Sequence, residues 1–432
     1  MSAPLRIALV HTADQGGGAE ASTVSLKNAL KALGHHCTLY VGTKRSDDQD
    51  IVEIARYRPF PGVLRAAKAL EDHLGWQYLY HPWFRKLDQL FSEPVDVVHY
   101  HSLWSGRLGY ADVGGLPALT SRYPSVMTLR DMWMLTGHCA YPAMGCERWR
   151  SGCGKCPDLT LAPAIPHDGT RFNWERKRKA IQRSDLQVTT VSGWLAETAR
   201  ACPIFQGKQI HTVHNGIDED AFHPMDRKQL RGQLGLPLNA FIVMVAGQSL
   251  EGTSQSDAGA RTFAIDAITQ SGVSPFILAV GHSASSFLAE SGCVGATVAF
   301  QKVPGQLAKY YAAADVVLVA SLWETFGRIP AEAQMCGVPV VAFATGGIPE
   351  IVIDDVTGIL APTGDVNLLA LGLRRLADNL GKREQMGQEA SRLSRGKFSN
   401  LAIAQQYVDL YRTVIRNRAE RKMTSNTAGI AE

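Results

Sequence analysis

Short apolar runs rich in β-branched residues recur along the first half of the chain, separated by stretches of helical length. The runs lie at Arg6–His11, Cys37–Val41, Val95–His101, Val126–Leu129 and Val188–Val191. Apolar runs without polar alternation are typical of parallel strands that are covered on both faces. The first half therefore predicts a doubly wound α/β domain built on a parallel sheet.

The same rhythm begins again in the second half. A helical stretch over residues 306–314 separates two of its apolar runs. These runs are Phe241–Ala246, Phe276–Val280, Ala296–Val303, Val316–Ala320 and Val338–Phe343. The repeat predicts a second domain of the same kind. The fold class is therefore α/β, with two Rossmann-like, doubly wound parallel-sheet domains in tandem.

The two series also suggest domain limits. We place an N-terminal domain at residues 1–192, with an insertion at 131–175, and a C-terminal domain at residues 193–398, with the seam near 193–225. Residues 399–418 are expected to form a helix that crosses back to the N-terminal domain. Residues 419–432 are mostly small and polar, and we expect a flexible tail there.

Length and composition agree with this picture. The 432 residues are 45% hydrophobic and 19% charged, which is a globular composition and excludes collagen-like, coiled-coil and wholly disordered chains. The formal net charge of +4 gives no general attraction to nucleic acid. No apolar stretch approaches the roughly 18 residues of a membrane span, and we see no export signal. We therefore expect a cytoplasmic protein.

One segment that does not fit the strand and helix rhythm is residues 55–90, where basic and aromatic side chains alternate. Such a mixture is compatible with a lid or a membrane-touching face. The alternative is a helical excursion whose aromatic side chains pack on the domain.

The insertion at 131–175 contains Cys139, Cys146, Cys153 and Cys156, the last two in a CxxC spacing. Four thiolates this close together can enclose a tetrahedral structural zinc ion. Two disulfides or four free thiols are the alternatives. A redox role is less favoured, because no helix directly follows the CxxC as it does in thioredoxin-like proteins.

The strongest chemical signal is a segment with two glutamates after the run Val316–Ala320. Pro330 belongs in a first helical turn, which places Glu324 in the preceding loop and Glu332 within the helix. A helix start offers unpaired amides and a positive dipole end to a diphosphate, and carboxylates accept hydrogen bonds from sugar hydroxyls. A nucleotide sugar contains both a diphosphate and sugar hydroxyls, so it matches this arrangement. The alternative is that both glutamates are exposed charges that favour the helix start.

The first strand leads into a glycine-rich turn, Gly16–Gly18, ahead of a helix-prone stretch. Its amides are suited to an anion at a helix start. The turn lacks the GxGxxG spacing, so a tight turn with no ligand is an equal alternative.

Further motifs accompany the paired glutamates, at Val213–Asp218, Thr345–Val352 and Thr357–Leu360. Together they resemble retaining glycosyltransferases of family 4, which have two glutamates at the same spacing. Segments 98–101 and 128–139 look like the bacterial members that build exopolysaccharides or lipid-linked repeat units. The resemblance covers nearly the whole chain and is weakest over residues 45–92. It implies the GT-B fold, in which two domains face each other across a cleft, and catalysis without a metal or other cofactor.

The resemblance also implies roles for single residues. Glu332 is expected to hold the ribose hydroxyls of a donor and Glu324 its sugar hydroxyls. The expected catalytic residues are Glu324, Arg130 and His138. The expected donor-binding residues are Gly17, Gly18, Asn215, Gln248, Arg261, Thr325, Phe326, Gly327, Arg328 and Glu332. Because retention in this family is attributed to attack from the leaving group's own face, no side-chain nucleophile is required.

Two features depart from the family pattern. Arg130 stands where the family usually has a histidine beside the donor sugar. An arginine cannot act as a general base, although it can bind a phosphate or an acidic sugar. His138 is a candidate to compensate, and the alternative is an imidazole that is packed or lies beside zinc.

The second departure concerns the cations that neutralise the departing diphosphate. The family has an arginine and a lysine after the first strand of the donor domain, where this chain has Gln248 and Gly259. Arg261 and Arg328 are candidate replacements. Cationic clamps of this kind supply several kcal/mol of transition-state stabilisation. The chain is therefore an enzyme with a rearranged clamp or a weakened relative.

The resulting expectation is a retaining glycosyltransferase that uses a UDP- or GDP-sugar and a saccharide or lipid-linked acceptor in polysaccharide biosynthesis. We expect a cytoplasmic location, with peripheral contact at the inner face of the membrane as a further expectation, and no nucleic-acid partner. The alternative is a nucleotide-sugar-binding or scaffold protein of the same fold. A phosphorylase is disfavoured, because no lysine stands in a setting suited to pyridoxal phosphate.

Overall fold

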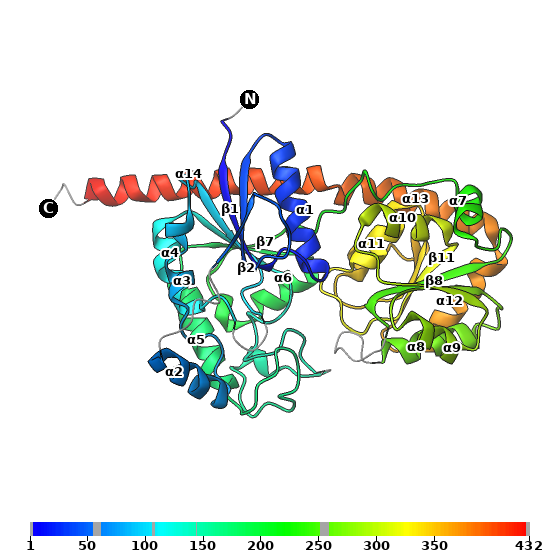
Figure 1. Ribbon diagram of the computed structural model, residues 1–432, viewed down its shortest axis with the longest axis horizontal. Coiled ribbons are helices and arrows are strands. Elements are labelled where there is room, and N and C mark those ends of the chain that lie inside the picture. The colour runs from blue at the N-terminus through cyan, green and yellow to red at the C-terminus, as the bar shows by residue number, and fades with distance from the viewer. Residues whose placement is uncertain (1–2, 55–61, 106–108, 144, 251–258, 429–432) are drawn as a thin grey trace. The chain divides into compact units, whose positions relative to one another are not determined.

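The computed structural model describes residues 3–54, 62–105, 109–143, 145–250 and 259–428 (Figure 1). The chain divides into two compact units. The first contains Met1–His214 and Ile403–Glu432, and the second contains Asn215–Ala402. Residues 193–214, which we assigned to the C-terminal domain, belong to the first unit. The reason is that they contain β7 (Ile210–Thr212), which completes the first sheet.

Seven parallel strands form the sheet of the first unit, in the order β3-β2-β1-β4-β5-β6-β7. Their bounds are β1 Arg6–Ala13, β2 His36–Thr43, β3 Ile51–Glu53, β4 Val97–Tyr100, β5 Ser125–Leu129, β6 Gln187–Thr190 and β7 Ile210–Thr212. The strand order reverses between β1 and β4. Open α/β sheets bind their ligands at such a switch point, outside the carboxyl ends of the strands.

The helices of this unit are α1 Gly18–Ala32, α2 Gly62–His73, α3 Pro82–Arg85, α4 Leu116–Arg122, α5 Thr170–Arg183, α6 Gly193–Arg200 and most of α14 Asn400–Ala428. Short 3₁₀ segments lie at Leu87–Leu90, Val113–Gly115, Arg148–Arg150 and Pro203–Phe205. The apolar side chains of α14 join those of β1 and β2 in one buried cluster, which includes Leu9, Leu39, Tyr407, Val408 and Tyr411. The last helix is therefore part of the core of the first unit.

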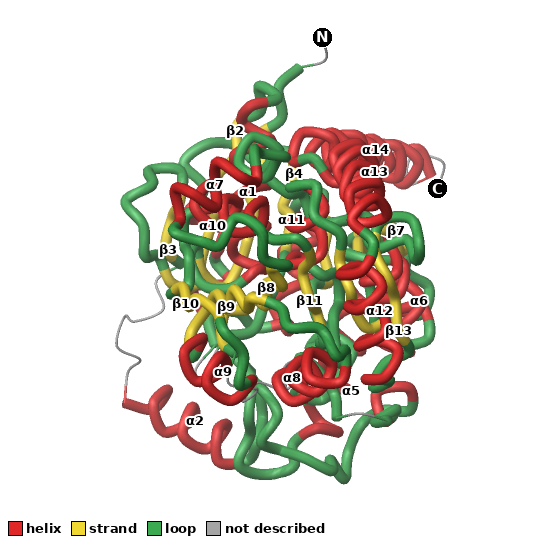
Figure 2. The backbone as a smooth tube through the Cα atoms, turned by 90° about the vertical axis from the view of Figure 1, so that its right-hand side faces the viewer, coloured by secondary structure: helices red, strands yellow, loops and turns green. Residues whose placement is uncertain are grey.

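Six parallel strands form the second sheet, in the order β10-β9-β8-β11-β12-β13. Figure 2 labels β10, β9, β8, β11 and β13, which follow one another in that order. Their bounds are β8 Ile242–Ser249, β9 Phe276–His282, β10 Gly295–Val298, β11 Val316–Val319, β12 Val340–Phe343 and β13 Gly358–Ala361. Here the order reverses between β8 and β11, which defines the second switch point.

Helices cover both faces of the second sheet: in Figure 1, α10 and α11 lie on one side of β8 and β11, and α8, α9 and α12 on the other. The helix bounds are α7 Arg227–Leu234, α8 Ala260–Gln270, α9 Ala284–Ser291, α10 Pro304–Ala313, α11 Arg328–Met335, α12 Val366–Asp378 and α13 Leu380–Phe398, with a 3₁₀ turn at Ile348–Glu350. Side chains of Asp226, Asp365 and Asn379 cap α7, α12 and α13. Such caps satisfy amides that a helix start leaves unpaired.

Every strand predicted from an apolar run is present. All residues of β4, β5, β11 and β12 are buried, as expected for strands covered on both faces. Three strands escaped prediction, namely β3, β7 and β13. β3 and β7 have three residues each and lie at the edges of their sheet, and β13 lies at an edge as well. Edge strands need less apolar sequence, so they leave a weaker pattern.

The basic and aromatic segment is outside the described residues over 55–61. Beyond it, Trp76 stacks on Phe172 with ring centroids 4.5 Å apart, and Tyr78 and Phe84 are buried. In the described part, the aromatic side chains therefore pack mainly on the unit, as in the helical alternative. No helix among the described residues is both long and apolar enough to cross a bilayer.

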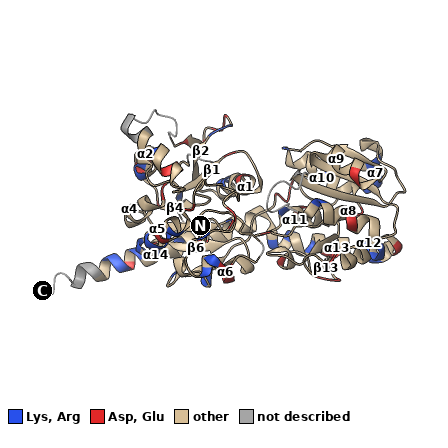
Figure 3. Cartoon of the chain, turned by 90° about the horizontal axis from the view of Figure 1, so that it is seen from below, with Lys and Arg blue, Asp and Glu red and all other residues tan. Residues whose placement is uncertain are grey.

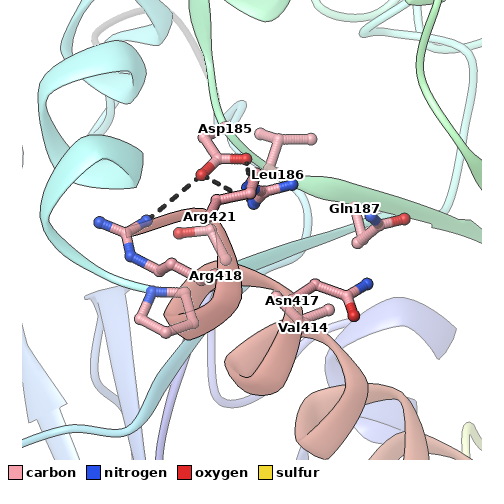
Figure 4. Close-up of a pocket in the computed structure, with 9 residues that line it drawn as sticks. Asp185, Leu186, Gln187, Val414, Asn417, Arg418 and Arg421 are labelled. Atoms are coloured by element: carbon pink, nitrogen blue, oxygen red, sulfur yellow. Dashed lines mark hydrogen bonds and ion pairs between the residues drawn. The ribbon is translucent and has the colours of Figure 1, made fainter. Parts of the chain in front are cut away.

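The end of α14 is helical as far as Ala428, where we expected a flexible tail from residue 419. Basic residues, coloured blue in Figure 3, recur along α14 as far as Lys422. Arg418 is buried and donates to the carbonyl oxygens of Thr120, Ser121 and Tyr123 at the carboxyl end of α4. Arg418 and Arg421 both approach the carboxylate of Asp185 (Figure 4). These contacts hold the helix beyond residue 418.

We predict that Arg418→Ala lowers the free energy of unfolding by about 2 kcal/mol, because it leaves buried carbonyl oxygens without a hydrogen-bond donor. Arg421→Ala is the matched control. Arg421 is exposed and, within the described structure, its side chain makes a surface ion pair with Asp185, so its loss is expected to cost no more than about 0.5 kcal/mol. Urea denaturation of the full chain measures both. Equal losses would show that Arg418 does not anchor the helix.

Candidate functional site

The turn between β11 and α11 has the arrangement that the sequence predicted. Glu324 lies in the loop, Pro330 lies in the first turn of α11, and Glu332 lies inside the helix. Gly327 is the N-cap and has φ of +104°, a left-handed conformation that favours glycine. Thr325, Phe326 and Gly327 are buried. Two carboxylates therefore lie on either side of a helix start.

A second loop, after β12, fixes the backbone of this turn. The amide of Gly347 donates to the carbonyl oxygen of Glu324 at 2.9 Å, and the Thr345 hydroxyl donates to the carbonyl oxygen of Leu322 at 2.8 Å. Gly346 has φ of +53°, and a Cβ there would collide with the Glu324 carbonyl group. Only glycine allows the loops to approach this closely, which explains the Gly346–Gly347 pair in the sequence.

Glu332 is buried and holds two partners. Arg328, one helical turn earlier, donates to its Oε1 at 2.6 Å, and the Tyr311 hydroxyl donates to its Oε2 at 3.2 Å. Burial, followed by the negative charge of Glu332, raises the pKa of Tyr311, so the hydroxyl keeps its proton. Each carboxylate oxygen retains a further lone pair. Glu332 can therefore accept a ligand hydroxyl only next to these partners or in place of one.

The side chains predicted to contact the diphosphate differ in how far they are already engaged by other residues. Gln248 is exposed at the carboxyl end of β8, beside the second switch point. Arg261 has its guanidinium held by Glu290, the Ser286 hydroxyl and the carbonyl oxygen of Leu250. Both proposed replacement cations, Arg261 and Arg328, are thus already bound to carboxylates. Part of the segment between Gln248 and Gly259, residues 251–258, lies outside the described structure.

Asn215 begins the second unit, next to a close backbone contact. Gly216 packs against Asn400, where a Cβ would meet the Asn400 side chain. Ile217 exchanges two backbone hydrogen bonds with the segment Phe398–Asn400. This contact fixes the segment that follows Asn215 against the start of α14.

In the first unit, the glycine-rich turn precedes α1. The amide of Gly17 donates to the Glu20 carboxylate at 2.8 Å, whereas Gly18 is exposed at the helix start. The Gly17 amide, predicted to bind a donor, is therefore occupied by a capping-box carboxylate. This agrees with the alternative in which Gly17 belongs to a tight turn that binds no ligand.

Arg130 lies directly after β5 and belongs to a buried cluster that the sequence did not reveal. Its Nε donates to Nδ1 of His101 at 3.3 Å. His11 and His99 lie on the neighbouring strands β1 and β4. Their spacing in the sequence carries no motif, and only the strand order β1-β4-β5 brings them together. They could have been found only from the rule that strand ends converge at a switch point of the sheet.

Lys177 fixes the segment after Arg130. Its ammonium group is buried and donates to the carbonyl oxygens of Trp133 at 2.6 Å and Thr136 at 3.1 Å. It also lies 3.5 Å from the centre of the Trp133 ring. Burial lowers the pKa of Lys177 well below its usual value. This lysine is a positioning residue that sequence reasoning missed.

His138 is packed among the residues of the insertion. Its Nδ1 lies 3.2 Å from the carbonyl oxygen of Pro163, and its Nε2 lies 3.4 Å from Sγ of Cys156 and 3.2 Å from the carbonyl oxygen of Asp158. With both ring nitrogens engaged, His138 fits the alternative of a packed imidazole. The structure does not support its predicted catalytic role.

The four cysteines of the insertion line one small pocket together with His138. None of the four takes part in a disulfide. Burial raises the pKa of Cys139 to about 12 and that of Cys153 to about 11, which disfavours thiolates and redox chemistry. Within the described residues, no three His, Cys, Asp or Glu side chains are arranged to hold a metal ion. The structural zinc ion stays a prediction that this geometry does not support.

Metal analysis tests that prediction. If zinc binds, we expect about one equivalent in purified protein and its loss in Cys153→Ser. Cys293→Ser, a half-buried thiol of the second unit, is the matched control. Wild-type protein without zinc after growth in zinc-containing medium would reject the metal site and leave the free thiols.

The two loops give a second prediction. Gly346→Ala should lower the free energy of unfolding by roughly 3 kcal/mol, because its Cβ meets backbone that cannot move aside. Gly364→Ala is the control, since Gly364 also has positive φ but open space around its Cβ position. We expect it to cost about 1 kcal/mol. Similar losses in urea denaturation would contradict the proposed role of the close approach.

Two family models match the chain. The model described as Glycosyltransferase Family 4 matches residues 16–221, and the model described as Glycosyl transferases group 1 matches residues 294–393. The second match contains the whole turn between β11 and α11. The two matches fall largely on different units of the structure.

Curated relatives are glycosyltransferases by name. D-inositol 3-phosphate glycosyltransferase 1 of Catenulispora acidiphila is 33% identical over 296 residues, which are 66% of this chain and 64% of the relative. The D-inositol 3-phosphate glycosyltransferase of Mycobacterium avium is 38% identical over 280 residues, 63% of this chain and 58% of the relative. The matches thus span about half to two thirds of the length of these relatives.

Solved structures share the fold. Sucrose-phosphate synthase from Thermosynechococcus elongatus has a TM-score of 0.69 at 20% identity, covering 96% of this chain and 100% of the other. Anabaena HepE in complex with UDP has a TM-score of 0.65 at 18% identity, covering 95% and 100%. The predicted GT-B fold is confirmed. With both family models matched and this fold, the chain belongs to the family 4 glycosyltransferases of the GT-B class.

Proposed function

We propose that this chain transfers a sugar from a nucleotide-sugar donor to an acceptor hydroxyl, with retention of configuration. The observation that carries the proposal is the turn at the second switch point, where Glu324 and Glu332 lie on either side of the start of α11. A helix start attracts a diphosphate, and carboxylates accept hydrogen bonds from sugar hydroxyls. The names of the relatives support a transferase.

In this proposal the second unit binds the donor. Glu324 accepts hydroxyls of the sugar, Glu332 accepts hydroxyls of the ribose beside Arg328, and amides at Phe326 and Gly327 face the diphosphate. The bond between the anomeric carbon and the diphosphate oxygen breaks, and the diphosphate keeps the electron pair. The acceptor hydroxyl attacks from the same face and gives its proton to the diphosphate. No metal or other cofactor is needed for this step.

The donor and acceptor classes follow the same proposal. A UDP-sugar is the first donor to test, because HepE was solved with UDP and with UDP-glucose. We propose a saccharide or lipid-linked acceptor in polysaccharide assembly, bound by the first unit in the cytoplasm. The basic stretch Arg416–Lys422 of α14 suits peripheral contact with an anionic membrane surface. The relatives' names make inositol phosphate an acceptor to include.

A second candidate is a protein that binds a nucleotide sugar without transferring it. The observation that favours it is the engagement of both candidate cations, Arg261 by Glu290 and Arg328 by Glu332. An ion pair of this kind offers less positive charge to a departing diphosphate. This candidate predicts donor binding with no turnover.

The deciding experiment measures turnover and UDP binding in Glu324→Gln. The variant removes the carboxylate charge but keeps a similar side-chain size. We expect donor hydrolysis or transfer from UDP-glucose, UDP-N-acetylglucosamine or GDP-mannose to fall about 100-fold, equivalent to about 2.7 kcal/mol of transition-state stabilisation. The dissociation constant of UDP should change less than threefold, because UDP carries no sugar.

Glu389→Gln is the matched control, since Glu389 is partly exposed on α13 and, among the described residues, pairs with Arg392. Its turnover should equal that of the wild type. Unchanged turnover in Glu324→Gln would reject the proposed role of this glutamate. Tight donor binding by the wild type with no turnover on any acceptor would favour the second candidate.

A further inference from the structure

Three imidazoles and one guanidinium gather at the first switch point. His11 lies near the end of β1, His99 in β4, His101 directly after β4, and Arg130 directly after β5. All four side chains are more than nine-tenths buried. The His99 and His101 rings are 4.0 Å apart, and the His11 and His101 rings meet edge to face at 6.0 Å. The cluster is contiguous and lies where this fold binds ligands.

The cluster carries one permanent positive charge. Arg130 is cationic at every relevant pH. Burial and then other nearby charges, Arg130 among them, lower the pKa of His11, His99 and His101, so the three imidazoles are neutral near pH 7. The Asp131 carboxylate next along the chain turns to the Trp104 ring nitrogen and the Trp133 amide. The Glu20 carboxylate lies 3.9 Å from Nε2 of His11 and accepts from the Gly17 amide.

Three ring nitrogens of the cluster have no hydrogen-bond partner within the described structure: both of His11 and Nε2 of His101. Buried polar atoms are normally satisfied, so three unsatisfied atoms in one place indicate a polar occupant. Because Nδ1 of His101 accepts from Arg130, the neutral ring carries its proton on Nε2. The occupant must therefore accept hydrogen bonds.

The cluster is also held rigidly. His99 has both ring nitrogens bound, Nδ1 to the Tyr411 hydroxyl and Nε2 to the Thr128 hydroxyl, each at 2.6 Å. Tyr407 on α14 also contacts the Thr128 hydroxyl at 3.1 Å. The His101 ring packs against this fixed ring at a tilt of 39° and in turn contacts Arg130. A preorganised donor set loses little entropy when it binds an acceptor.

We propose that this cluster binds an oxyanion, a phosphate or carboxylate group of the sugar or acceptor, through the guanidinium of Arg130 and Nε2–H of His101. An oxyanion matches the positive charge, accepts several hydrogen bonds and fits the fork of an arginine. Arg130 is 8% exposed and reaches the surface, whereas the imidazoles lie behind it. This inference rests on the proposed function, because it names the substrate class of that transferase as anionic.

The test titrates the full chain at low ionic strength with inorganic phosphate, glucose 6-phosphate, glucuronate and glucose, using calorimetry. We expect the three anions to bind and glucose not to bind. The comparison of glucose 6-phosphate with glucuronate tells which anionic group is preferred. Arg130→Gln should weaken phosphate binding at least tenfold. Arg130→Lys, which keeps the charge but loses the fork, should give an intermediate loss.

Arg183→Gln is the matched control, because Arg183 is exposed in the last turn of α5 and the variant removes the same charge. It should change phosphate affinity less than twofold. A loss of phosphate affinity equal to that of Arg130→Gln would mean nonspecific electrostatic attraction of phosphate to the chain and would overturn the proposal. If Arg130→Gln fails to fold, the imidazole ¹⁵N signal of His101, assigned with His101→Gln, must shift on adding phosphate to the wild type.

UDP separates the two proposals. A wild-type chain that binds UDP but none of the three anions would overturn this inference, attribute the unsatisfied nitrogens to bound water, and leave the proposed function in place. A chain that binds the anions but neither UDP nor GDP would support the oxyanion site and reject the proposed function instead.

Discussion

The backbone contact between two glycine-containing loops sets the geometry of the second switch point. The carbonyl oxygen of Glu324 accepts from the Gly347 amide, and Gly346 passes so close that no side chain fits. Since neither partner is a side chain, the contact cannot relax through a rotamer change. The position of the Glu324 backbone, and with it the start of α11, is therefore determined by β11 and β12, two fully buried strands.

The strands were predictable because burial on both faces leaves a continuous apolar run. β13, at an edge of the second sheet, and the three-residue β3 and β7 lack such a run, so no clear pattern marked them. The domain limit was misplaced for the same reason, since β7 is the element that joins residues 193–214 to the first sheet. The helical end of α14 was missed because its anchor, Arg418, binds carbonyl groups about 300 residues away in sequence.

The candidate site was predictable where it is local in sequence. Pro330 alone placed one glutamate in the loop and the other in the helix. The Arg328–Glu332 pair has the i, i+4 spacing of a helix and was within reach of the sequence, whereas Arg261 meets Glu290 on a different helix and was not predictable. The same holds for His11, His101 and Arg130, which only the strand order brings together. His138, chosen from its motif, proved to be packed among residues of its own insertion.

The two switch points share a topology and differ in charge. At the second, carboxylates dominate and Arg328 already compensates Glu332, so hydroxyl groups rather than anions are the better partners for the carboxylate oxygens. At the first, burial and neighbouring charges lower the pKa of three histidines, and the charge of the cluster is that of Arg130 alone. Because a guanidinium does not titrate near neutral pH, that charge stays constant while the imidazoles remain neutral. The first switch point thus has the charge that the proposed oxyanion needs, and the second has the carboxylates that the proposed sugar hydroxyls need.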